Sequence, residues 1–486
     1  MAQFPFKSLR VWLDFLDEQG GLIHNKAEVD LRGDISAIAR KLSQVGSKTG
    51  SSPAIIHENV RGYPGWRVAT STLNTYEQLA WAIGEKTPEN VLKAIAPRLD
   101  MRVPPMQVST GPCKELKMLG DEVDLTKIPH PFTGAYDGIP NITAGMSNKR
   151  DIDTGWQNIA IRRLAVKGKN IMAEFINQAN QDFRIWGAYR RAKRKMDVAY
   201  IIGPDPVCYL ASGTKAPAGV CEYDLWGAFT GMPLEVVKCE TNDLLVPANA
   251  EIIIEGEIDP VERELDGPFP EWVGYYSPLA QVAKVKVNAI TMRKDPIYYY
   301  MNMGWLPTEG ESMGGFMTSA NIFQELQKMF GKAVMDVYAI SWNIIVIKVD
   351  KKVSKGFGGG PMAHHVGMIS KYMVAPYLKM VIVVDDDVDD IHDLVGVFNA
   401  LMSKYEAGED TIIVKRSTGT LLDPSEPWSG RAGRWGWEDF SIMDCTEKVA
   451  PWDEGYLRGK AVPPKWAEEK IEKNLEKYGL GNLNIK

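Results

Sequence analysis

The sequence predicts a multi-domain protein of the α/β class, in which a β-rich middle section separates two sections of mixed helices and strands. Three observations lead to this prediction. The 486 residues suffice for two or three domains of ordinary size. The pattern of apolar residues changes near residues 115 and 320. The composition, 45% hydrophobic and 24% charged, is that of an ordinary folded protein, and we find no internal repeat or low-complexity tract.

The N-terminal section, residues 1–114, is predicted to form an α/β domain. Apolar residues recur at helical spacing in two segments, and two short apolar runs follow them. Residues 98–114 are rich in proline and polar side chains, so we interpret them as a linker. Helices are expected at 8–19 and 33–45, and strands at 53–58 and 66–70.

The middle section, residues 115–320, is predicted to be a β-domain that closes as a barrel. Its runs alternate apolar and polar residues or are rich in Val, Ile and Tyr, as half-buried strands are. One helix, expected at 182–196, interrupts the strands. The strands are expected at 158–166, 198–202, 235–239, 250–258, 280–291 and 296–302.

The third section, residues 321–450, alternates strands and helices, which indicates an α/β layer. A tail, residues 451–486, follows it and carries a charged amphipathic helix. Helices are expected at 318–332, 364–375, 391–404 and 464–478, and strands at 343–349, 380–384 and 411–414.

The charge, the hydropathy and the cysteine content of the chain indicate which partners and which location to expect. The net charge of -6 and the pI of about 5.7 argue against a nucleic-acid partner, because phosphate-binding surfaces are basic. No run approaches the roughly 18–20 apolar residues that cross a bilayer, so we expect no membrane span. Five cysteines, an odd number without paired spacing, indicate reduced thiols and a cytoplasmic protein.

Polar side chains of the middle section form the first candidate group. Asn158 and Arg163 lie five apart on one strand-like run, so strict alternation puts them on opposite faces unless a bulge intervenes. Residues 212–217 precede Glu222, and the small residues and hydroxyls within this segment could approach a phosphate. A plain surface turn is the simpler interpretation of that segment.

Two carboxylates, Asp266 and Glu271, form the second candidate group. They lie five apart around a Gly-Pro turn with aromatic neighbours. Such a pair can divide the roles of acid and base when the surroundings of the two carboxyls differ. By spacing alone, a surface turn is again the simpler interpretation.

The methionines and aromatic residues between Tyr298 and Met317 suit either an apolar substrate pocket or core packing. His364 and His365 are adjacent on a predicted helix, so at most one of them can face a site. A role at a helix start or an interface is the simpler interpretation of this pair.

Several blocks occur in order along almost the whole chain: SLRVWLDFLDEQGGL, DEVDLTKIPHP, GWQNIAIRRL, IIGPDP, DGPFPEWVGYY and VIVVDDDVDDIHDL. In this order they resemble the UbiD family of decarboxylases and carboxylases. The chain looks most like the subgroup that acts on phenolic and other aromatic acids, including the phenylphosphate carboxylase type. The resemblance implies a reversible (de)carboxylase of an aromatic or otherwise unsaturated carboxylic acid.

The resemblance also implies a fold and a set of cofactors. The middle section would be a split, flavin-reductase-like β-barrel that binds prenylated FMN, and the third section an α/β oligomerisation domain. A divalent metal, Mn²⁺ or Mg²⁺, would accompany the cofactor together with K⁺, because oxygen ligands suit such ions. By position, the metal ligands would be Asn158, Glu222 and Gln181 (or Asp182). Further cofactor contacts would come from Ile161, Arg163, Ser212, Gly213 and Thr214.

The family's catalytic network, an arginine between two acids, matches Arg163, Asp266 and Glu271. Glu271 would exchange a proton with the carbon that loses or gains carbon dioxide, and Asp266 would orient Arg163. The implied partners are an aromatic acid, carbon dioxide or bicarbonate, a flavin prenyltransferase that supplies the cofactor, and further copies of the chain in a dimer or hexamer.

Three positions depart from the family pattern. Gln181 (or Asp182) replaces a histidine ligand, and Asp266 replaces a glutamate. Phe440 replaces a lysine, for which Arg431 or Arg434 could substitute.

The departures support a second hypothesis, a non-catalytic partner subunit of a larger carboxylase. A silent subunit has no physical need for all four of the residues retained here, which are Asn158, Arg163, Glu222 and Glu271. A metal-dependent hydrolase is a third hypothesis, but the chain has no histidine-rich metal motif.

Overall fold

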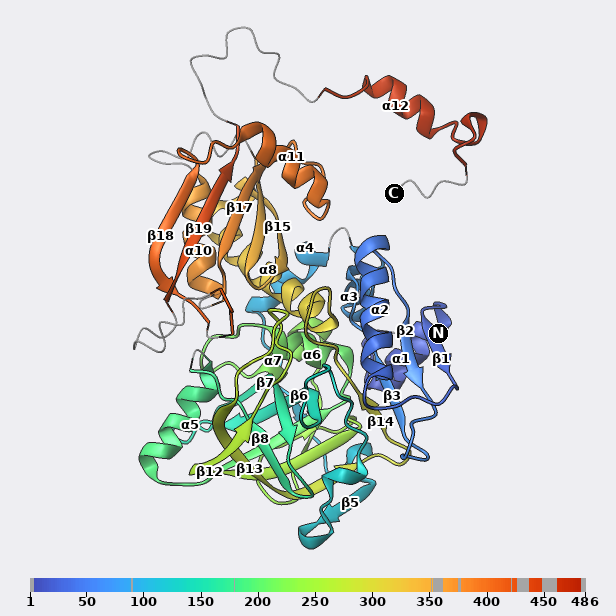
Figure 1. Cartoon of the computed structure of the whole chain (residues 1–486), viewed down its shortest axis with the longest axis vertical. Coiled ribbons are helices and arrows are strands. Elements are labelled where there is room, and N and C mark those ends of the chain that lie inside the picture. Colours follow the sequence, from blue (N-terminus) through green and yellow to red (C-terminus); the bar gives the residue numbers. More distant parts are fainter. Residues whose placement is uncertain are drawn as a thin grey trace.

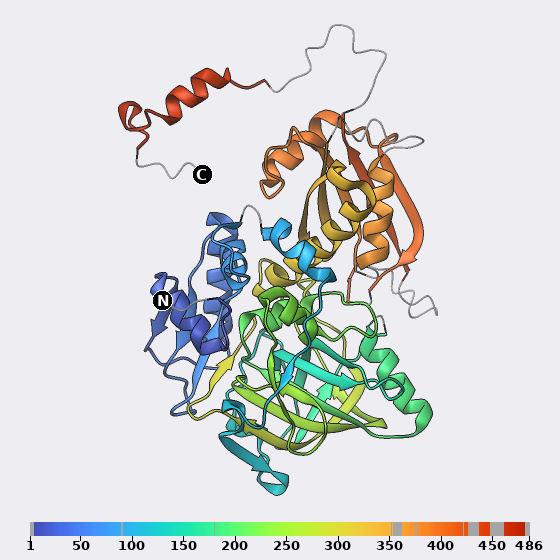
Figure 2. The same ribbon diagram turned by 180° about the vertical axis from the view of Figure 1, so that it is seen from behind.

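The computed structural model of the chain is built around three β-sheet bodies (Figures 1 and 2). It describes residues 4–88, 91–178, 180–350, 352, 362–374, 377–420, 422–425, 437–447 and 461–481. A barrel forms the lower part of the molecule in Figure 1. The N-terminal sheet lies at the side of the barrel, and the C-terminal sheet lies above it. The long helix α8 (Glu309–Phe330) contacts helices or strands of all three bodies.

The N-terminal body pairs two helices, α1 (Leu9–Glu18) and α2 (Asp34–Thr49), with a four-stranded sheet. Helix α1 begins at Ser8, whose hydroxyl accepts a hydrogen bond from the Val11 N–H, and it buries residues at helical spacing. Each fully buried large apolar side chain contributes roughly 1.5–3 kcal/mol. The sheet follows the order β1 (Leu22–Asn25), β2 (Ala54–His57), β3 (Arg67–Thr70) and β14 (Ile297–Tyr299).

Strand β14 was expected in the β-rich middle section, but it pairs in parallel with β3. All three of its residues are buried. A run without alternation shows that both faces of a strand are covered, and it carries no information about the sheet to which the strand belongs.

The predicted barrel is confirmed. In the described part of the chain, six antiparallel strands of a seven-stranded sheet close on themselves through the pairing of the first and sixth strands. The order is β12 (Ile252–Asp266), β9 (Met196–Ile202), β6 (Asn141–Arg150), β7 (Gln157–Val166), β8 (Ile171–Glu174) and β13 (Ala280–Met292). Strand β6 was missed because its buried residues include Asn, Thr, Ser and Lys, which hide the apolar pattern.

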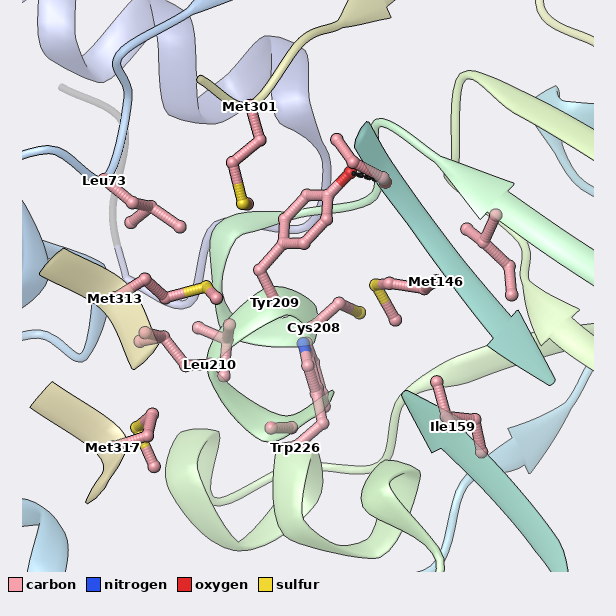
Figure 3. Packing of buried hydrophobic residues seen from close by; sticks show 14 of the residues in the cluster. Leu73, Met146, Ile159, Cys208, Tyr209, Leu210, Trp226, Met301, Met313 and Met317 are labelled. Atoms are coloured by element: carbon pink, nitrogen blue, oxygen red, sulfur yellow. Dashed lines mark hydrogen bonds between the residues drawn. The ribbon is translucent and has the colours of Figure 1, made fainter. Parts of the chain in front are cut away.

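Three helices cover the barrel: α5 (Gln181–Ala192), α6 (Pro206–Gly213) and α7 (Glu222–Thr230). Residues 212 and 213, expected in a loop, instead end α6, whose first turn is capped by the Asp205 carboxylate. In Figure 3, Tyr209 of α6 lies among Met301, Met313 and Cys208. The Tyr209 hydroxyl donates to the Ala144 carbonyl oxygen of β6 at 2.9 Å, which fixes α6 on the barrel.

The C-terminal body is a five-stranded mixed sheet with helices, as the α/β pattern predicted. Its order is β15 (Val334–Ser341), β16 (Ile344–Val349), β17 (Met380–Asp385), β19 (Trp437–Cys445) and β18 (Thr411–Thr418), with α10 (Met362–Val374) and α11 (Leu394–Lys404). Helix α8 begins at Glu309, well before the expected residue 318, because three glycines weaken the helical signal of its first turns. Strands β15 and β19 were not predicted.

Besides several short 3-10 helices, the smaller elements are α3 (Tyr76–Ala82), α4 (Val91–Ile95), β4 (Met106–Gln107), β5 (Leu116–Leu119), β10 (Glu235–Lys238), β11 (Leu245–Pro247) and α12 (Lys465–Glu472). Arg431 and Arg434 lie outside the described residues. Within the described ranges, no helix combines the length and the apolarity that crossing a bilayer requires.

Candidate active site

A cavity of about 410 Å³ opens where the barrel, α6, α7, α8 and the C-terminal body meet, and we call it the central cavity. Its volume lies in the range of small-molecule sites. Its wall is apolar over much of its area, with a few polar side chains, as ligand sites usually are. Of the predicted residues, the wall contains Asn158, Ile161, Arg163, Gln181, Ser212, Gly213, Thr214, Glu222 and Glu271.

Arg163 of β7 lies between the two predicted acids. Its Nη1 donates to both oxygens of Asp266, at 2.8 and 2.7 Å, and its Nε donates to Oε1 of Glu271 at 3.0 Å. The guanidinium lies 4.6 Å from the centre of the Phe269 ring, and Nη2 lies 3.4 Å from the Ser277 hydroxyl. Asp266 stands behind the arginine, whereas Glu271 lines the cavity. The turn between the two acids is therefore part of a buried ionic network.

Strand alternation alone would have separated Asn158 from Arg163, yet both line the central cavity. Strand β6 has a bulge between Ile142 and Gly145, opposite the end of β7 that carries Arg163. The cavity wall includes every residue of β7 from Asn158 to Arg163, so it is not confined to one face of this strand.

The two carboxyls of the network have different surroundings. Burial raises the pKa of Glu271, and the charge of Arg163 offsets part of that rise. Both oxygens of Asp266 are engaged by the guanidinium, whereas only Oε1 of Glu271 is. This arrangement suits one acid that transfers a proton and another that holds the cation in place.

Asn158, Gln181 and Glu222 bring three oxygen-bearing side chains to one side of the cavity. The Ile159 N–H donates to Oε2 of Glu222 at 2.7 Å, and Gln181 Nε2 donates to the Ala216 carbonyl at 2.8 Å. Burial raises the pKa of Glu222 to about 8, and the charge of Arg162 on the same wall offsets only a small part of that rise. A bound cation would supply a further positive charge, and the oxygen donors fit an ion such as Mn²⁺ or Mg²⁺.

Clusters of acids or histidines that could hold a metal do not occur in the part of the chain that the structure describes. Among the described residues, no three His, Cys, Asp or Glu side chains gather around one point. The predicted ligand set has one carboxylate and two amides, so any ion there would meet a weakly charged site.

The residues predicted at a phosphate lie at the end of α6 and just beyond it. The hydroxyls of Ser212 and Thr214 donate to the carbonyls of Tyr209 and Leu210, each at 3.0 Å. A phosphate would have to draw these hydroxyl protons away from the helix.

Lys215, the next residue, also lines the cavity, and its Nζ donates to the Met373 carbonyl at 3.1 Å. The side chain is solvent-exposed, but the protein that surrounds it lowers its pKa to about 8 by partial desolvation. Sequence reasoning missed this lysine because it judged the segment by its small residues.

A buried ionic cluster beneath the cavity was also missed. Lys149 is fully buried, and its Nζ lies 2.6 Å from Glu174 and 3.1 Å from Asp182. Burial by itself raises the pKa of Asp182, but the charges of Arg162 and Lys149 outweigh it and lower the pKa to about 2. Strand β6 mixes polar and apolar residues, so its sequence does not indicate that Lys149 points into the interior.

This cluster orients Asn158. The Asn158 Nδ2 donates to Oδ1 of Asp182 at 2.7 Å, which leaves Oδ1 of the asparagine, the atom that a cation requires, on the opposite side of the amide. Asp182, the alternative to Gln181 as a ligand, is committed to Arg162 and Lys149 and lies outside the cavity wall.

The remaining candidates divide between site and scaffold. Met301, Met303 and Met313 line the cavity, whereas Phe316 is buried in the core and Trp305 is exposed. The segment therefore contributes both to the cavity wall and to the core.

His364 and His365 are exposed on α10 and do not line the cavity. Phe440 is fully buried in β19, where the Lys371 Nζ lies 5.4 Å from the centre of its ring.

Comparison with known proteins adds independent findings. Models of the N-terminal, Rift-related and C-terminal domains of 3-octaprenyl-4-hydroxybenzoate carboxy-lyase match residues 13–99, 106–305 and 311–438. The phenolic acid decarboxylase of Bacillus subtilis is 29% identical, over 97% of this chain and 99% of that protein.

Two solved structures are similar along nearly their whole length. HmfF from Pelotomaculum thermopropionicum, solved in complex with FMN, is 32% identical with a TM-score of 0.82, over 95% of this chain and 99% of that one. Vanillic acid decarboxylase of Sedimentibacter hydroxybenzoicus, in its closed form, is 28% identical with a TM-score of 0.83, over 98% of this chain and 99% of that one.

Proposed function

Because the chain belongs to the UbiD family of carboxy-lyases, we propose that it is a prenylated-FMN-dependent decarboxylase of an aromatic or otherwise unsaturated carboxylic acid, which can also run as a carboxylase. The observation that carries the proposal is Arg163 held between Asp266 and Glu271 at the central cavity. The phenolic and vanillic acid decarboxylases among the similar proteins support the substrate class. The HmfF complexes with FMN and with prenylated FMN support the cofactor.

Loss of carbon dioxide from an sp² carbon leaves an electron pair for which side chains offer no sink, and prenylated FMN, when bound, supplies that sink. The protein's task is then to bind, orient and shield the substrate. Met301, Met303 and Met313 provide an apolar wall suited to a flat ring and to the exclusion of water.

Glu271 moves the proton. Burial raises its pKa, so more of this carboxyl is protonated near neutral pH than in an exposed glutamate. In decarboxylation the carboxyl gives its proton to the carbon that loses carbon dioxide, and it takes another from solvent before the next turnover. Asp266 positions Arg163 through two hydrogen bonds, and Arg163 in turn holds Oε1 of Glu271.

A metal and a set of contacts complete the proposed site. Asn158, Gln181 and Glu222 would hold Mn²⁺ or Mg²⁺, with K⁺ nearby, because all three present oxygen atoms. Ile161, Ser212, Gly213 and Thr214 would contact the cofactor from the same wall.

Three further proposals concern the supply of the cofactor, the assembly of the chain and its location in the cell. A flavin prenyltransferase would supply the cofactor. The chain would assemble as a dimer or hexamer through its C-terminal body, which is supported by the exposed apolar side chains of α11. The five cysteines form no disulfide with one another, which supports a cytoplasmic location.

The test is to produce the protein together with a flavin prenyltransferase and to identify the bound small molecule by absorbance and mass. About one prenylated FMN per chain, with release of carbon dioxide from a phenolic or benzoic acid, is the expected result. A matched control is Glu271→Gln in the same host, which should carry the cofactor without turnover.

The second hypothesis, a non-catalytic partner subunit, predicts a different outcome. Protein that takes up no flavin, during production or on later reconstitution, would make Gln181 and Phe440 decisive departures and would refute the enzyme proposal.

A further inference from the structure

Three aromatic side chains from two bodies of the molecule meet on the wall of the central cavity, and we call them the aromatic trio. Trp272 follows Glu271 in the loop between β12 and β13, Trp342 lies in the turn between β15 and β16, and Tyr377 precedes β17. The Trp272 ring lies 5.1 Å from that of Trp342 and 5.6 Å from that of Tyr377, with interplanar angles of 64° and 90°. The Trp342 and Tyr377 rings lie 6.0 Å apart. Tilted and edge-to-face pairs at these distances attract each other.

Trp342 is seated closely on α8. A Cβ at Gly314 would lie 2.4 Å from the Trp342 ring, so only glycine at this position allows the ring to approach the helix. The cavity end of α8 and the turn of the C-terminal sheet are therefore packed as one unit.

Tyr377 is tied to the barrel side. Its hydroxyl accepts a hydrogen bond from Asn177 at 3.5 Å and donates to Asn180 at 3.3 Å. Both asparagines lie between β8 and α5, on the same cavity wall. Trp342 and Tyr377 thus present a fixed aromatic surface to Trp272, which is itself 4% exposed.

We propose that Trp342 and Tyr377 are positioning residues, which pack on Trp272 and so hold the neighbouring Glu271 carboxyl beside Arg163 and away from water. The inference rests on the proposed function, in which Glu271 is the acid. Among the described residues, the charged and titratable groups that face Glu271 are Arg163, Asp266 and the Tyr377 hydroxyl. Substitution of Trp342 leaves all three in place, so the change that it makes is in packing and shielding.

The first measurement is hydrogen–deuterium exchange of residues 267–276 in the protein without cofactor. Trp342→Ala is expected to speed exchange there about tenfold, because the loop loses its packing partner. Trp342→Phe retains a ring and should restore most of the protection. Trp437→Ala is the matched control, since this tryptophan of the same body is 47% exposed and lies outside the cavity wall.

The second measurement is the pH profile of turnover in the holoenzyme. We expect Trp342→Ala to lower kcat by about tenfold or more, within the cost of a small misplacement, and to change KM less than about twofold. The basic limb of kcat should move to lower pH, because a better hydrated carboxyl has a lower pKa. Tyr377→Phe, which keeps the ring, should cause a smaller change of the same kind.

The outcomes separate this inference from the proposed function. If the unaltered protein fails to decarboxylate any acid, the proposed function fails, and the exchange measurement still tests the packing role. Unchanged exchange of residues 267–276 in folded Trp342→Ala overturns the inference. A lower kcat with an unchanged pH profile overturns the inference as well. Such a result would mean that less folded enzyme is present, because loss of folded protein lowers the rate without changing the pKa of Glu271. If Trp342→Ala does not fold, Trp342→Leu takes its place under the same criteria.

Discussion

At the scale of single residues, the site depends on one arginine shared by two buried carboxyls. Arg163 engages both oxygens of Asp266 and one oxygen of Glu271, so the two acids meet the same cation in different ways. The cation offsets the repulsion that two buried acids would otherwise feel. The acid that is held by one oxygen is also the one that lines the cavity.

Replacing Glu271 by glutamine tests its role as the acid. The amide keeps the shape and can still accept a hydrogen bond from Arg163, but it cannot supply a proton. We expect kcat to fall by roughly 10²–10⁴, the usual contribution of a positioned acid, with flavin affinity nearly unchanged. Carbon dioxide release and quenching of flavin fluorescence measure the two quantities. Glu262→Gln, at an exposed acid, is the control, and full activity of Glu271→Gln would contradict the assignment.

The dependence on pH should have opposite signs in the two directions of reaction. Burial raises the pKa of Glu271 above its ordinary value, so the protonated form persists to higher pH. Decarboxylation needs that form, and its kcat should stay level at low pH and fall as pH rises through the raised pKa. Carboxylation needs the ionised form and should rise over the same interval. Initial rates in both directions, at fixed carbon dioxide concentration, check this, and a parallel dependence would exclude Glu271 as the shared group.

Lys149 is predicted to be important for stability. Replacement by methionine leaves Glu174 and Asp182 buried beside a neutral side chain, and loss of one partner of a buried ion pair costs about 3–5 kcal/mol. The midpoint of urea unfolding should fall accordingly. Lys195→Met removes an exposed partner of Glu257 and should lower the midpoint much less, because exposed ion pairs contribute little. Equal midpoints for the two variants would show that the buried cluster does not stabilise the fold.

At the scale of helices and strands, the sequence predicted those elements whose burial is visible as an apolar pattern. Strands β7, β9 and β13 were expected within a few residues of their observed bounds. Strand β6 was not, because its buried polar residues are satisfied by partners that lie far away in the sequence, such as Glu174 for Lys149. Local composition does not reveal such tertiary partners.

The same limit applies to the candidate site. Family resemblance named Arg163, Asp266 and Glu271, and the structure brings them together. Neither resemblance nor spacing named Trp342 or Tyr377, because they reach the cavity from a sheet that the sequence could only outline. Whether a side chain of one body reaches a site in another depends on how the two bodies pack. The sequence of a short segment does not reveal that packing.

The first turn of α8 contains a buried carboxyl, that of Glu311, which should make the stability of the protein depend on pH. Glu311 is 4% exposed, and burial raises the pKa of its carboxyl to about 8, although the backbone N–H of Trp342 offsets part of that rise. The folded protein therefore holds this proton between the ordinary glutamate pKa and about 8, while the unfolded chain releases it. Stability should fall as pH rises through that window, by about 1.4 kcal/mol for each unit of pKa difference.

Glu311→Gln should remove this component of the pH dependence. The free energy of unfolding should then fall less between pH 5 and pH 8 in the variant than in the unaltered protein. Urea unfolding at the two pH values measures it. Glu325→Gln, at an exposed acid of the same helix, should leave the dependence as it is. An unchanged difference in Glu311→Gln would show that this carboxyl is already ionised in the folded state.

At the scale of the whole molecule, helix α11 presents an apolar face to solvent. Val395, Phe398 and Met402 are 77%, 58% and 79% exposed and recur at helical spacing. We expect this face to be covered by a second copy of the chain. Phe398→Glu combined with Met402→Glu should therefore shift the mass in solution, measured by light scattering, towards the monomer. Met329→Glu, an exposed methionine on α8, is the control, and an unchanged mass of the α11 variant would place the interface elsewhere.

The pairing of β3 with β14 has a consequence for synthesis on the ribosome. The partner of residues 67–69 lies at 297–299, so it emerges from the ribosome about 230 residues later. Until then, one edge of the N-terminal sheet has free N–H and C=O groups that can pair with any extended segment nearby. The barrel strands are translated during this interval, so a nascent chain must keep them from that edge. The first part of the chain to be made is therefore among the last to be completed as a folded body.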